Sequence, residues 1–340
     1  MPVAEEMKLL EELIKGAKEM IGKLVGKFAT FALMGSILAI APARAFPDRQ
    51  VTLVVPFAAG GPADLIGRVL AEALSKKFGQ RVIVENITGA GGTTGSLRVA
   101  NAASDGHTIL LGHIGTHGAA PALYRKLAYD PVTDFTPVGM VASTPMVLLA
   151  SKSVGQDSLD SFRQLVASRG EKLTFSHGGV GSISHLGCVM LNKELGITAT
   201  GIGYRGNGPA LQDLLSGQVD YMCDAVSTAK PHIEAGSLRA VMMLSNPHGI
   251  DLPAPTAKSA GTALDIVAWY ALFLPKNVDA KIRADVEAAL DFALELPEVK
   301  TTLAKVGTTT WPKETRSSAS VTPFLQSEIK KLKQVVEPID

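Results

Sequence analysis

Short apolar runs alternate with amphipathic segments along most of the chain. The run TLVVPF at 52–57 predicts a buried strand, and the apolar spacing from Ala63 to Phe78 predicts a helix. The pattern then repeats, with a strand at 81–85, a helix that ends near Ala103 and a strand at 108–111. Because strands alternate with helices, this part of the chain predicts a parallel sheet covered by helices.

A second α/β unit follows a long β-rich stretch at 138–151. It opens with a helix near 159–167. Its further strands are predicted at 173–176, 200–204, 219–223 and 238–244, and its further helices at 184–195, 209–215 and 228–234. A last apolar strand at 269–274 precedes helices near 279–295, 297–305 and 321–336. Since no low-complexity linker separates the two units, we expect strands to cross between them.

This restart of the pattern predicts two lobes. A return strand ends at Leu274, so we expect the first lobe to hold residues 46–145 and 269–340 and the second to hold 146–268. Open α/β sheets bind ligands beyond the carboxyl ends of their strands, against helix N-termini. Two such units that face each other would form a cleft.

The N-terminal region, 1–45, has the layout of a secretory signal. Two lysines precede the apolar run Phe28–Ala41, and Ala43-Arg44-Ala45 follows it, which predicts cleavage after Ala45. The run is shorter than the roughly 20 residues that span a bilayer. The first nineteen residues carry glutamates that a leader lacks, so translation starting at Met20 is one interpretation; their apolar residues also recur at helical spacing. Export would place the protein in the periplasm.

Composition narrows the classes of function. Hydrophobic residues make up 46% of the chain and charged residues 19%, which excludes disorder. Lys and Arg number 33 against 32 Asp and Glu, so no overall field favours nucleic acid. Aromatic content is 5%, and the two cysteines, Cys188 and Cys223, have no CxxC spacing. We expect two buried free thiols and a small polar ligand.

Three glycine-rich loops each follow a predicted strand and open a helix: 57–64, 89–95 and 176–185. Glycines there let backbone N–H groups approach an anion. Asp64 would read an ammonium or hydroxyl group of the ligand, or merely cap its helix while the glycines make the turn. In the second loop, Thr94 stands where a dinucleotide fingerprint needs its third glycine, so that fingerprint is absent.

The third loop lacks the glycine that a nucleophile elbow places two residues after its serine. Ser176 and Ser182 are therefore expected to help grip an anion. His185 is expected to orient the loop, and action as a base is the alternative. None of the three loops contains a lysine or arginine, and the nearest cation is Arg205. Neutral donors and helix N-termini would then hold an acid.

Metal binding is not expected. Three histidines, at 107, 113 and 117, lie around the third strand, but no cysteine or carboxylate interleaves them and their side chains alternate in direction.

In this order the motifs resemble the extracytoplasmic solute receptors of tripartite tricarboxylate transporters, the Bug family. The matching stretches in the first part are 46–57 (FPDRQVTLVVPF), Gly60-Gly61 with Asp64, Val84-Glu85-Asn86 with 89–92 (GAGG), Asp105-Gly106, and Tyr129-Asp130-Pro131 with Asp134-Phe135. Further along they are Gly181-Ser182 with His185-Leu186, Tyr204-Arg205-Gly206 with Pro209-Ala210, 217–220 (GQVD) and Pro255-Thr256. The resemblance spans nearly the whole chain after the leader.

The resemblance implies an α/β, two-lobed periplasmic-binding-protein fold, the type II-like Venus flytrap, with a central sheet in each lobe. It also implies a monomeric receptor rather than an enzyme, with no cofactor and no metal. Such a receptor binds a small carboxylate between its lobes and hands it to membrane permease subunits. The implied ligand-binding residues are Phe57, Ala59, Gly60, Gly61, Asp64, Gly91, Gly92, Thr93, His113, Thr116, Ser176, Gly179, Gly181, Ser182, His185, Tyr204, Gly206 and Asp224.

Three positions depart from the family pattern, which usually has proline at Ala59, tyrosine at His107 and asparagine at Ala120. Ligand choice is therefore left open among dicarboxylates, tricarboxylates, amino acids and aromatic acids. Two other functions stay open at this point. One is a sensor that presents its ligand to a membrane kinase, and the other is an exported hydrolase or metal-dependent enzyme.

Overall fold

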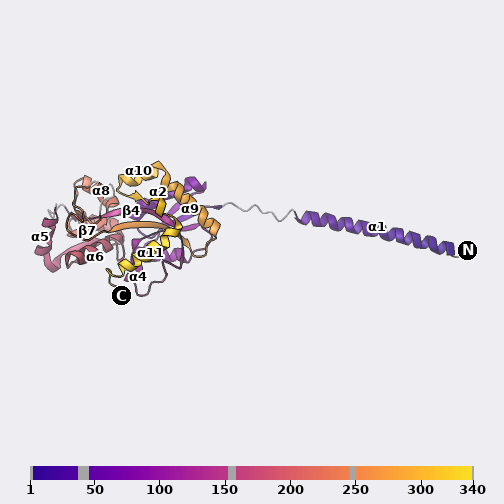
Figure 1. Ribbon diagram of the computed structural model, residues 1–340, viewed down its shortest axis with the longest axis horizontal. Helices are drawn as coiled ribbons and strands as arrows, with labels where there is room; N and C mark the ends of the chain where they lie inside the picture. The colour runs from indigo at the N-terminus through magenta and orange to yellow at the C-terminus, as the bar shows by residue number, and fades with distance from the viewer. Residues whose placement is uncertain (1–2, 37–45, 152–157, 246–249, 251, 339–340) are drawn as a thin grey trace. The chain divides into compact units, whose positions relative to one another are not determined.

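The computed structural model describes residues 3–36, 46–151, 158–245, 250 and 252–338, and the chain forms two units, Met1–Ala45 and Phe46–Asp340 (Figure 1). The first unit contains one helix, α1 (Val3–Ser36), whose described side chains are all exposed. The predicted cleavage site lies outside the described residues. Of the helices that the structure describes, none combines the length and the apolar character that crossing a bilayer requires.

The second unit is an α/β structure, as the sequence predicts. Its helices are α2 (Pro62–Phe78), α3 (Thr93–Ala100), α4 (Ala120–Leu123), α5 (Leu159–Arg169), α6 (Ile183–Leu195), α7 (Asn207–Leu215), α8 (Val226–Glu234), α9 (Ala280–Glu295), α10 (Pro297–Lys305) and α11 (Ser318–Leu332). Short helical turns are η2 (Ala90–Gly92), η3 (Ile114–Ala119), η5 (Gly170–Lys172) and η6 (Lys313–Thr315). Its strands are β1 (Val51–Val55), β2 (Val82–Asn86), β3 (Thr108–His113), β4 (Phe135–Ser151), β5 (Thr174–His177), β6 (Thr200–Gly203), β7 (Tyr221–Ala225), β8 (Leu238–Met243), β9 (Val267–Pro275) and β10 (Thr309–Thr310).

The strands form one mixed sheet in the order β2-β1-β3-β9-β4-β7-β5-β6, with β8 and β10 also paired to β4. In its first half, β1 pairs in parallel with β2 and β3, and β9 returns antiparallel to β3. In its second half, β5 pairs in parallel with β6 and β7. Helices α2, α9 and α10 pack together over the first half, and α5, α6 and α8 surround β7 (Figure 1).

Strand β4 joins the two halves of the sheet. Its segment 135–145 pairs with β9, and its segment 146–151 pairs with β7 and β8. The expectation of a strand that crosses between the units is therefore confirmed. Each half contains parallel strands that are followed by a glycine loop and a helix. Because the two halves pair with consecutive segments of β4, the carboxyl ends of these strands, with their glycine loops, come to one region of the unit.

Local chemistry explains helix α2. Gly61 precedes it and Pro62 stands in its first turn, where a missing N–H costs nothing. Gly79 ends it in a left-handed conformation, with its N–H bonded to the carbonyl of Ser75. Gly67 lies against β1, because a Cβ atom there would come 2.7 Å from Val55 Cγ2. The helix therefore packs close to the sheet.

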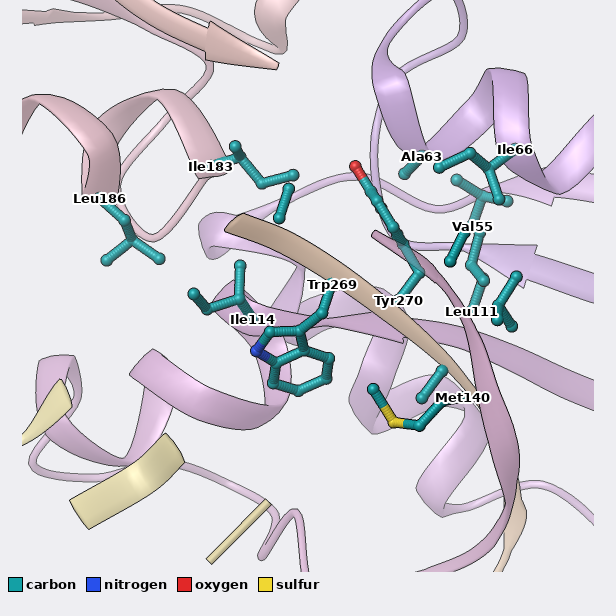
Figure 2. Packing of buried hydrophobic residues seen from close by; sticks show 14 of the residues in the cluster. Val55, Ala63, Ile66, Leu111, Ile114, Met140, Ile183, Leu186, Trp269 and Tyr270 are labelled. Atoms are coloured by element: carbon teal, nitrogen blue, oxygen red, sulfur yellow. The ribbon is translucent and has the colours of Figure 1, made fainter. Parts of the chain in front are cut away.

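One apolar core runs through both halves of the sheet. Figure 2 shows Val55, Leu111 and Met140 from the first half in the same cluster as Ile183 and Leu186 from the second. Trp269 and Tyr270 of β9 are among the largest fully buried side chains. Burial of this kind contributes about 25 cal/mol per Å² of apolar surface, so the two halves stabilise each other.

The turn η3 after β3 was not predicted from the sequence. It is one turn of π-helix that begins after His113, whose Nδ1 accepts a hydrogen bond from the backbone N–H of Gly115 at 2.6 Å. Thr116 completes the cap, because its hydroxyl accepts from the His113 N–H at 3.1 Å. Prediction of a helix depends on apolar periodicity, whereas this short turn is held by side-chain caps that leave no such pattern.

Both cysteines are free and buried, as expected, and the N–H of Cys223 donates to Cys188 Sγ at 3.0 Å. Burial raises the pKa of the Cys223 thiol, so it stays protonated and unreactive.

We expect a thiol reagent to label neither cysteine in the native protein and both after unfolding in denaturant without reductant. Absence of labelling after unfolding would instead indicate a disulfide.

Candidate functional site

A cavity of about 280 Å³ lies where loops of the two halves of the sheet meet. Its lining residues are Pro56, Phe57, Ala58, Thr88, Gly89, Ala90, Gly91, Gly92, Gly178, Gly179, Tyr204, Arg205 and Gly206. A smaller pocket of about 20 Å³, here called the inner pocket, adjoins it through Phe57, Ala58 and Gly206. The rest of the inner pocket is lined by Gly61, Pro62, Ala63, His113, Ser182, Ile183 and Asn207.

Four helices begin at these two cavities. Their N-caps are Gly61 of α2, Gly92 of α3, Ser182 of α6 and Gly206 of α7. The first N–H groups of a helix lack partners within it, and each N-terminus carries roughly half a positive charge. Two N-termini come from each half of the sheet, so the site presents positive potential from both sides.

The lining residues that the structure describes include no carboxylate, and Arg205 is the one permanent cation among them. The side chain of Arg205 is exposed, where solvent weakens its interaction with an anion. Backbone N–H groups and helix dipoles are thus the main positive features of the site. They suit a small anion better than a cation or a neutral molecule.

The first glycine loop is fixed by Asp64, which is 4% exposed. One carboxylate oxygen accepts from the Gly60 N–H at 3.0 Å and from Arg68 Nε at 2.9 Å, and the other accepts from Asn86 Nδ2 at 3.0 Å. Burial raises the pKa of Asp64, but these hydrogen bonds outweigh it and hold the pKa below its usual value. Asp64 therefore orders the loop, and the Gly60 N–H is occupied by Asp64 instead of being open to an anion.

His113 lines the inner pocket and stacks on Phe57, with ring centroids 4.4 Å apart. Burial lowers its pKa to about 3, so the imidazole is neutral at physiological pH. Because Nδ1 accepts from Gly115, the proton of the neutral ring lies on Nε2. His113 therefore contributes an uncharged ring to the lining of the inner pocket.

The third glycine loop is held by its own side chains. Ser182 caps α6 by accepting from the His185 N–H at 3.2 Å, and His185 Nδ1 accepts from the Gly181 N–H at 3.3 Å. Burial lowers the pKa of His185 to about 4. These contacts agree with a histidine that orients the loop. Ser182 Oγ also contacts Ser184 Oγ at 3.1 Å, so the serine acts as a cap first.

Asn207 was missed by the sequence analysis although it directly follows the Tyr-Arg-Gly motif. It lines the inner pocket, and its amide donates to Asp224 at 2.5 Å and accepts from Ser184 at 3.0 Å. Asp224 is fully buried and also accepts from Ala225 N–H and Thr228. Burial raises the pKa of Asp224 to about 6 against these hydrogen bonds. Asp224 therefore positions Asn207 from behind.

The structure brings half of the predicted ligand-binding residues to the cavities. Those that line them are Phe57, Gly61, Gly91, Gly92, His113, Gly179, Ser182, Tyr204 and Gly206. Those outside the two linings are Ala59, Gly60, Asp64, Thr93, Thr116, Ser176, Gly181, His185 and Asp224. Thr116 and Ser176 are fully buried behind the loops. The (i, i+4) spacing of Asp64 and Arg68 in the sequence could have indicated that Asp64 pairs with Arg68 instead of with a ligand.

The two halves of the sheet approach each other closely through glycines at the cavity. A Cβ atom at Gly91 would collide with the carbonyl oxygen of Val180, and one at Gly206 would come 2.8 Å from Ala58 Cβ. A Cβ atom at Gly115 would likewise collide with the carbonyl oxygen of Gly181. Only glycine allows the two halves of the sheet to come this close beside the cavity.

Among the described residues, no group of histidines, cysteines and carboxylates has the arrangement of a metal site. His107 contacts Asp48 and Asp105 near the ring of Phe46, while His117 stacks on Phe273 at 4.0 Å. His107 therefore lies apart from the other two histidines, while His113 and His117 both contact the Thr116 hydroxyl.

We expect Gly91→Ala to weaken binding of a small carboxylate anion about tenfold or more, because the new methyl group would hold Gly91 away from Val180 and oppose closure. Gly196→Ala is the matched control. Gly196 has φ 64° against 63° for Gly91, but nothing lies within 4 Å of its Cβ position. Both variants carry left-handed strain, about 1–2 kcal/mol. Calorimetry that gave equal affinities for the two variants would contradict the role of this close approach.

Solved structures and curated sequences resemble this chain over most of its length. MatC of Rhodopseudomonas palustris, solved with bound malate, is 42% identical and superposes with a TM-score of 0.82 over 86% of this chain and 100% of its own. A second R. palustris protein, solved with adipate, is 27% identical with a TM-score of 0.81 over the same shares. BugT of Bordetella pertussis is 32% identical over 324 residues, which cover 92% of this chain and 96% of BugT.

The sequence model of the tripartite tricarboxylate transporter family receptor matches residues 66–340. This match covers most of the chain, and BugT carries the name of the family that the motifs resemble. The periplasmic binding protein BugD is 32% identical and superposes with a TM-score of 0.82 over 86% of this chain and 100% of its own, which confirms the periplasmic-binding-protein fold. This chain belongs to the tripartite tricarboxylate transporter receptor family, the Bug receptors.

Proposed function

We propose that this chain is an extracytoplasmic receptor that binds a small dicarboxylate between two lobes and delivers it to the membrane permease of a tripartite tricarboxylate-type transporter. The observation that carries the proposal is the convergence of four helix N-termini on cavities whose described lining residues include no carboxylate. Malate and adipate, found in two structural relatives, are both small dicarboxylates.

Each carboxylate of such a ligand would meet neutral donors. Two facing helix N-termini provide about one positive charge between them, and each interaction stabilises an anion by about 0.3–2 kcal/mol according to burial. Donors fixed by the backbone need no reorganisation when the ligand arrives. Because they do not ionise, affinity should change little at pH values well above 6, where both ligand carboxylates and Asp224, which holds Asn207, stay charged.

The contacts of the third loop favour a receptor over a hydrolase. A serine nucleophile needs a base within hydrogen-bond reach of its hydroxyl. Ser182 Oγ instead accepts from the His185 backbone, and His185 Nδ1 accepts from Gly181. The low pKa of His185 also makes it a weak base.

The proposed lobes are residues 46–145 with 269–340, and 146–268. Strand pairing supports this division, since β1, β2, β3, β9 and β10 are linked with the first segment of β4, and β5 to β8 with its second segment. The chain passes between the proposed lobes in β4 and again near the start of β9. Rotation about these two connections would open the cavity for ligand release, and the closed form would be the one that the permease recognises. We propose that the receptor works as a monomer in the periplasm.

Export rests on the N-terminal region. The compact unit begins at Phe46, the residue that follows the predicted cleavage site. The ring of Phe46 packs against Phe78 and His107, so this residue is part of the folded unit.

We expect malate or adipate to stabilise the exported protein against heat. A ligand at 100 times its dissociation constant adds about 2.7 kcal/mol, which corresponds to a rise in Tm of about 5 °C for a protein of this size. Thermal shift measured against a panel of mono-, di- and tricarboxylates tests this. The acid should be recovered unchanged after denaturation. No shift with any acid, or conversion of the acid into a product, would refute the proposal.

We expect N-terminal sequencing of the protein from the periplasm to begin at Phe46. A small-residue site behind an apolar run is the signal that a leader peptidase recognises. An Ala45→Lys variant should accumulate uncleaved, whereas Ile40→Lys, in the apolar run, should reduce export itself. Periplasmic protein that begins at Met1 or Met20 would contradict cleavage.

A further inference from the structure

Tyr270 of β9 has a buried hydroxyl group without a partner among the described residues. The residue is 0% exposed, and its hydroxyl lacks a hydrogen bond to any residue that the structure describes. Buried hydroxyl groups in folded proteins nearly always have a partner, because leaving one unpaired costs about 1–3 kcal/mol. Other buried tyrosines of this chain follow the rule, since Tyr129 donates to the Thr116 carbonyl and Tyr221 to Asn192.

The Tyr270 side chain lies directly behind the residues that line the inner pocket and points toward them. On the neighbouring strand β3, His113 pairs directly with Tyr270, and their rings meet edge to face with centroids 6.1 Å apart. His113 itself lines the inner pocket. Figure 2 shows the Tyr270 hydroxyl reaching past the sheet toward Ala63 and Ile183, which line the same pocket from α2 and α6.

The neighbourhood decides which chemistry could satisfy this hydroxyl. Burial, and secondly the Asp224 carboxylate, raise the pKa of Tyr270, so the phenol keeps its proton and serves as a donor. The His113 Nδ1 acceptor is already occupied by Gly115. The N-caps of α2 and α6, Gly61 and Ser182, border the same pocket and favour negative charge.

We propose that Tyr270 is a specificity-determining residue whose hydroxyl donates a hydrogen bond to a carboxylate oxygen at the inner end of the bound ligand. This inference rests on the proposed function and assigns a donor to one end of the dicarboxylate. It makes Tyr270 a donor that comes from a strand of the sheet, β9, while the other donors belong to loops and helix ends. An acid with an apolar inner end leaves the hydroxyl unpaired and is disfavoured.

The test compares Tyr270→Phe with wild-type protein in calorimetric titrations with malate and with adipate. The variant keeps the ring and its packing. We expect it to bind the preferred acid about 10- to 100-fold more weakly, as loss of a hydrogen bond to a charged group implies. The melting temperature without ligand should be unchanged or higher, because an unpaired buried hydroxyl has been removed.

Tyr221→Phe is the matched control. It removes the hydroxyl of another fully buried tyrosine, one that already has a hydrogen-bond partner, Asn192 at 2.7 Å. We expect it to lower the melting temperature and to leave affinity unchanged. The two variants should thus show opposite patterns of stability and affinity.

The outcomes separate the two proposals. Wild-type protein that binds an acid with the same affinity as Tyr270→Phe overturns the role of Tyr270 and leaves the receptor function standing. A drop in the melting temperature of ligand-free Tyr270→Phe, with affinity unchanged, would show a purely structural hydroxyl. Wild-type protein that binds no acid overturns the receptor function and the role of Tyr270 together.

Discussion

The pairing of β4 with strands of both halves of the sheet is the constraint on which the rest of the structure depends. Its first segment pairs with β9 and its second with β7 and β8, so the two halves are joined by backbone hydrogen bonds instead of a flexible tether. This pairing brings the carboxyl ends of β1, β3 and β5 toward one region, with the helix N-termini beyond them. The site therefore follows from topology before any side chain is considered.

The proposed recognition of the ligand by neutral groups follows from that arrangement. Carboxylate side chains near the loops are used within the chain, as Asp64 shows by bonding Gly60, Arg68 and Asn86. His113 and His185 are kept uncharged by burial. Positive potential then comes from the helix N-termini, whose strength does not depend on a proton equilibrium.

Much of this could be predicted from the sequence. Apolar periodicity and glycine turns indicated the order of strands and helices, and the motifs identified the family. The partners of single side chains could not be predicted in the same way. The Asp64–Arg68 pair is an exception, because its (i, i+4) spacing is visible in the sequence. Asp224 holds Asn207 from another strand end, and Tyr270 lies beside His113 of the inner pocket because β9 pairs with β3. Such long-range pairing leaves no periodic signal in the sequence.

The close glycine approaches at Gly91 and Gly206 have a consequence for how such receptors diversify. At Gly91 the opposing atom is a backbone carbonyl oxygen and at Gly206 it is the Cβ atom of Ala58, so a side chain added at either position would push the two halves apart. New ligand preferences must then arise at wall positions that carry side chains, such as Thr88 and Asn207, which line the cavities. Relatives of one fold that were solved with acids as different in length as malate and adipate are in line with such a division between fixed glycines and variable side chains.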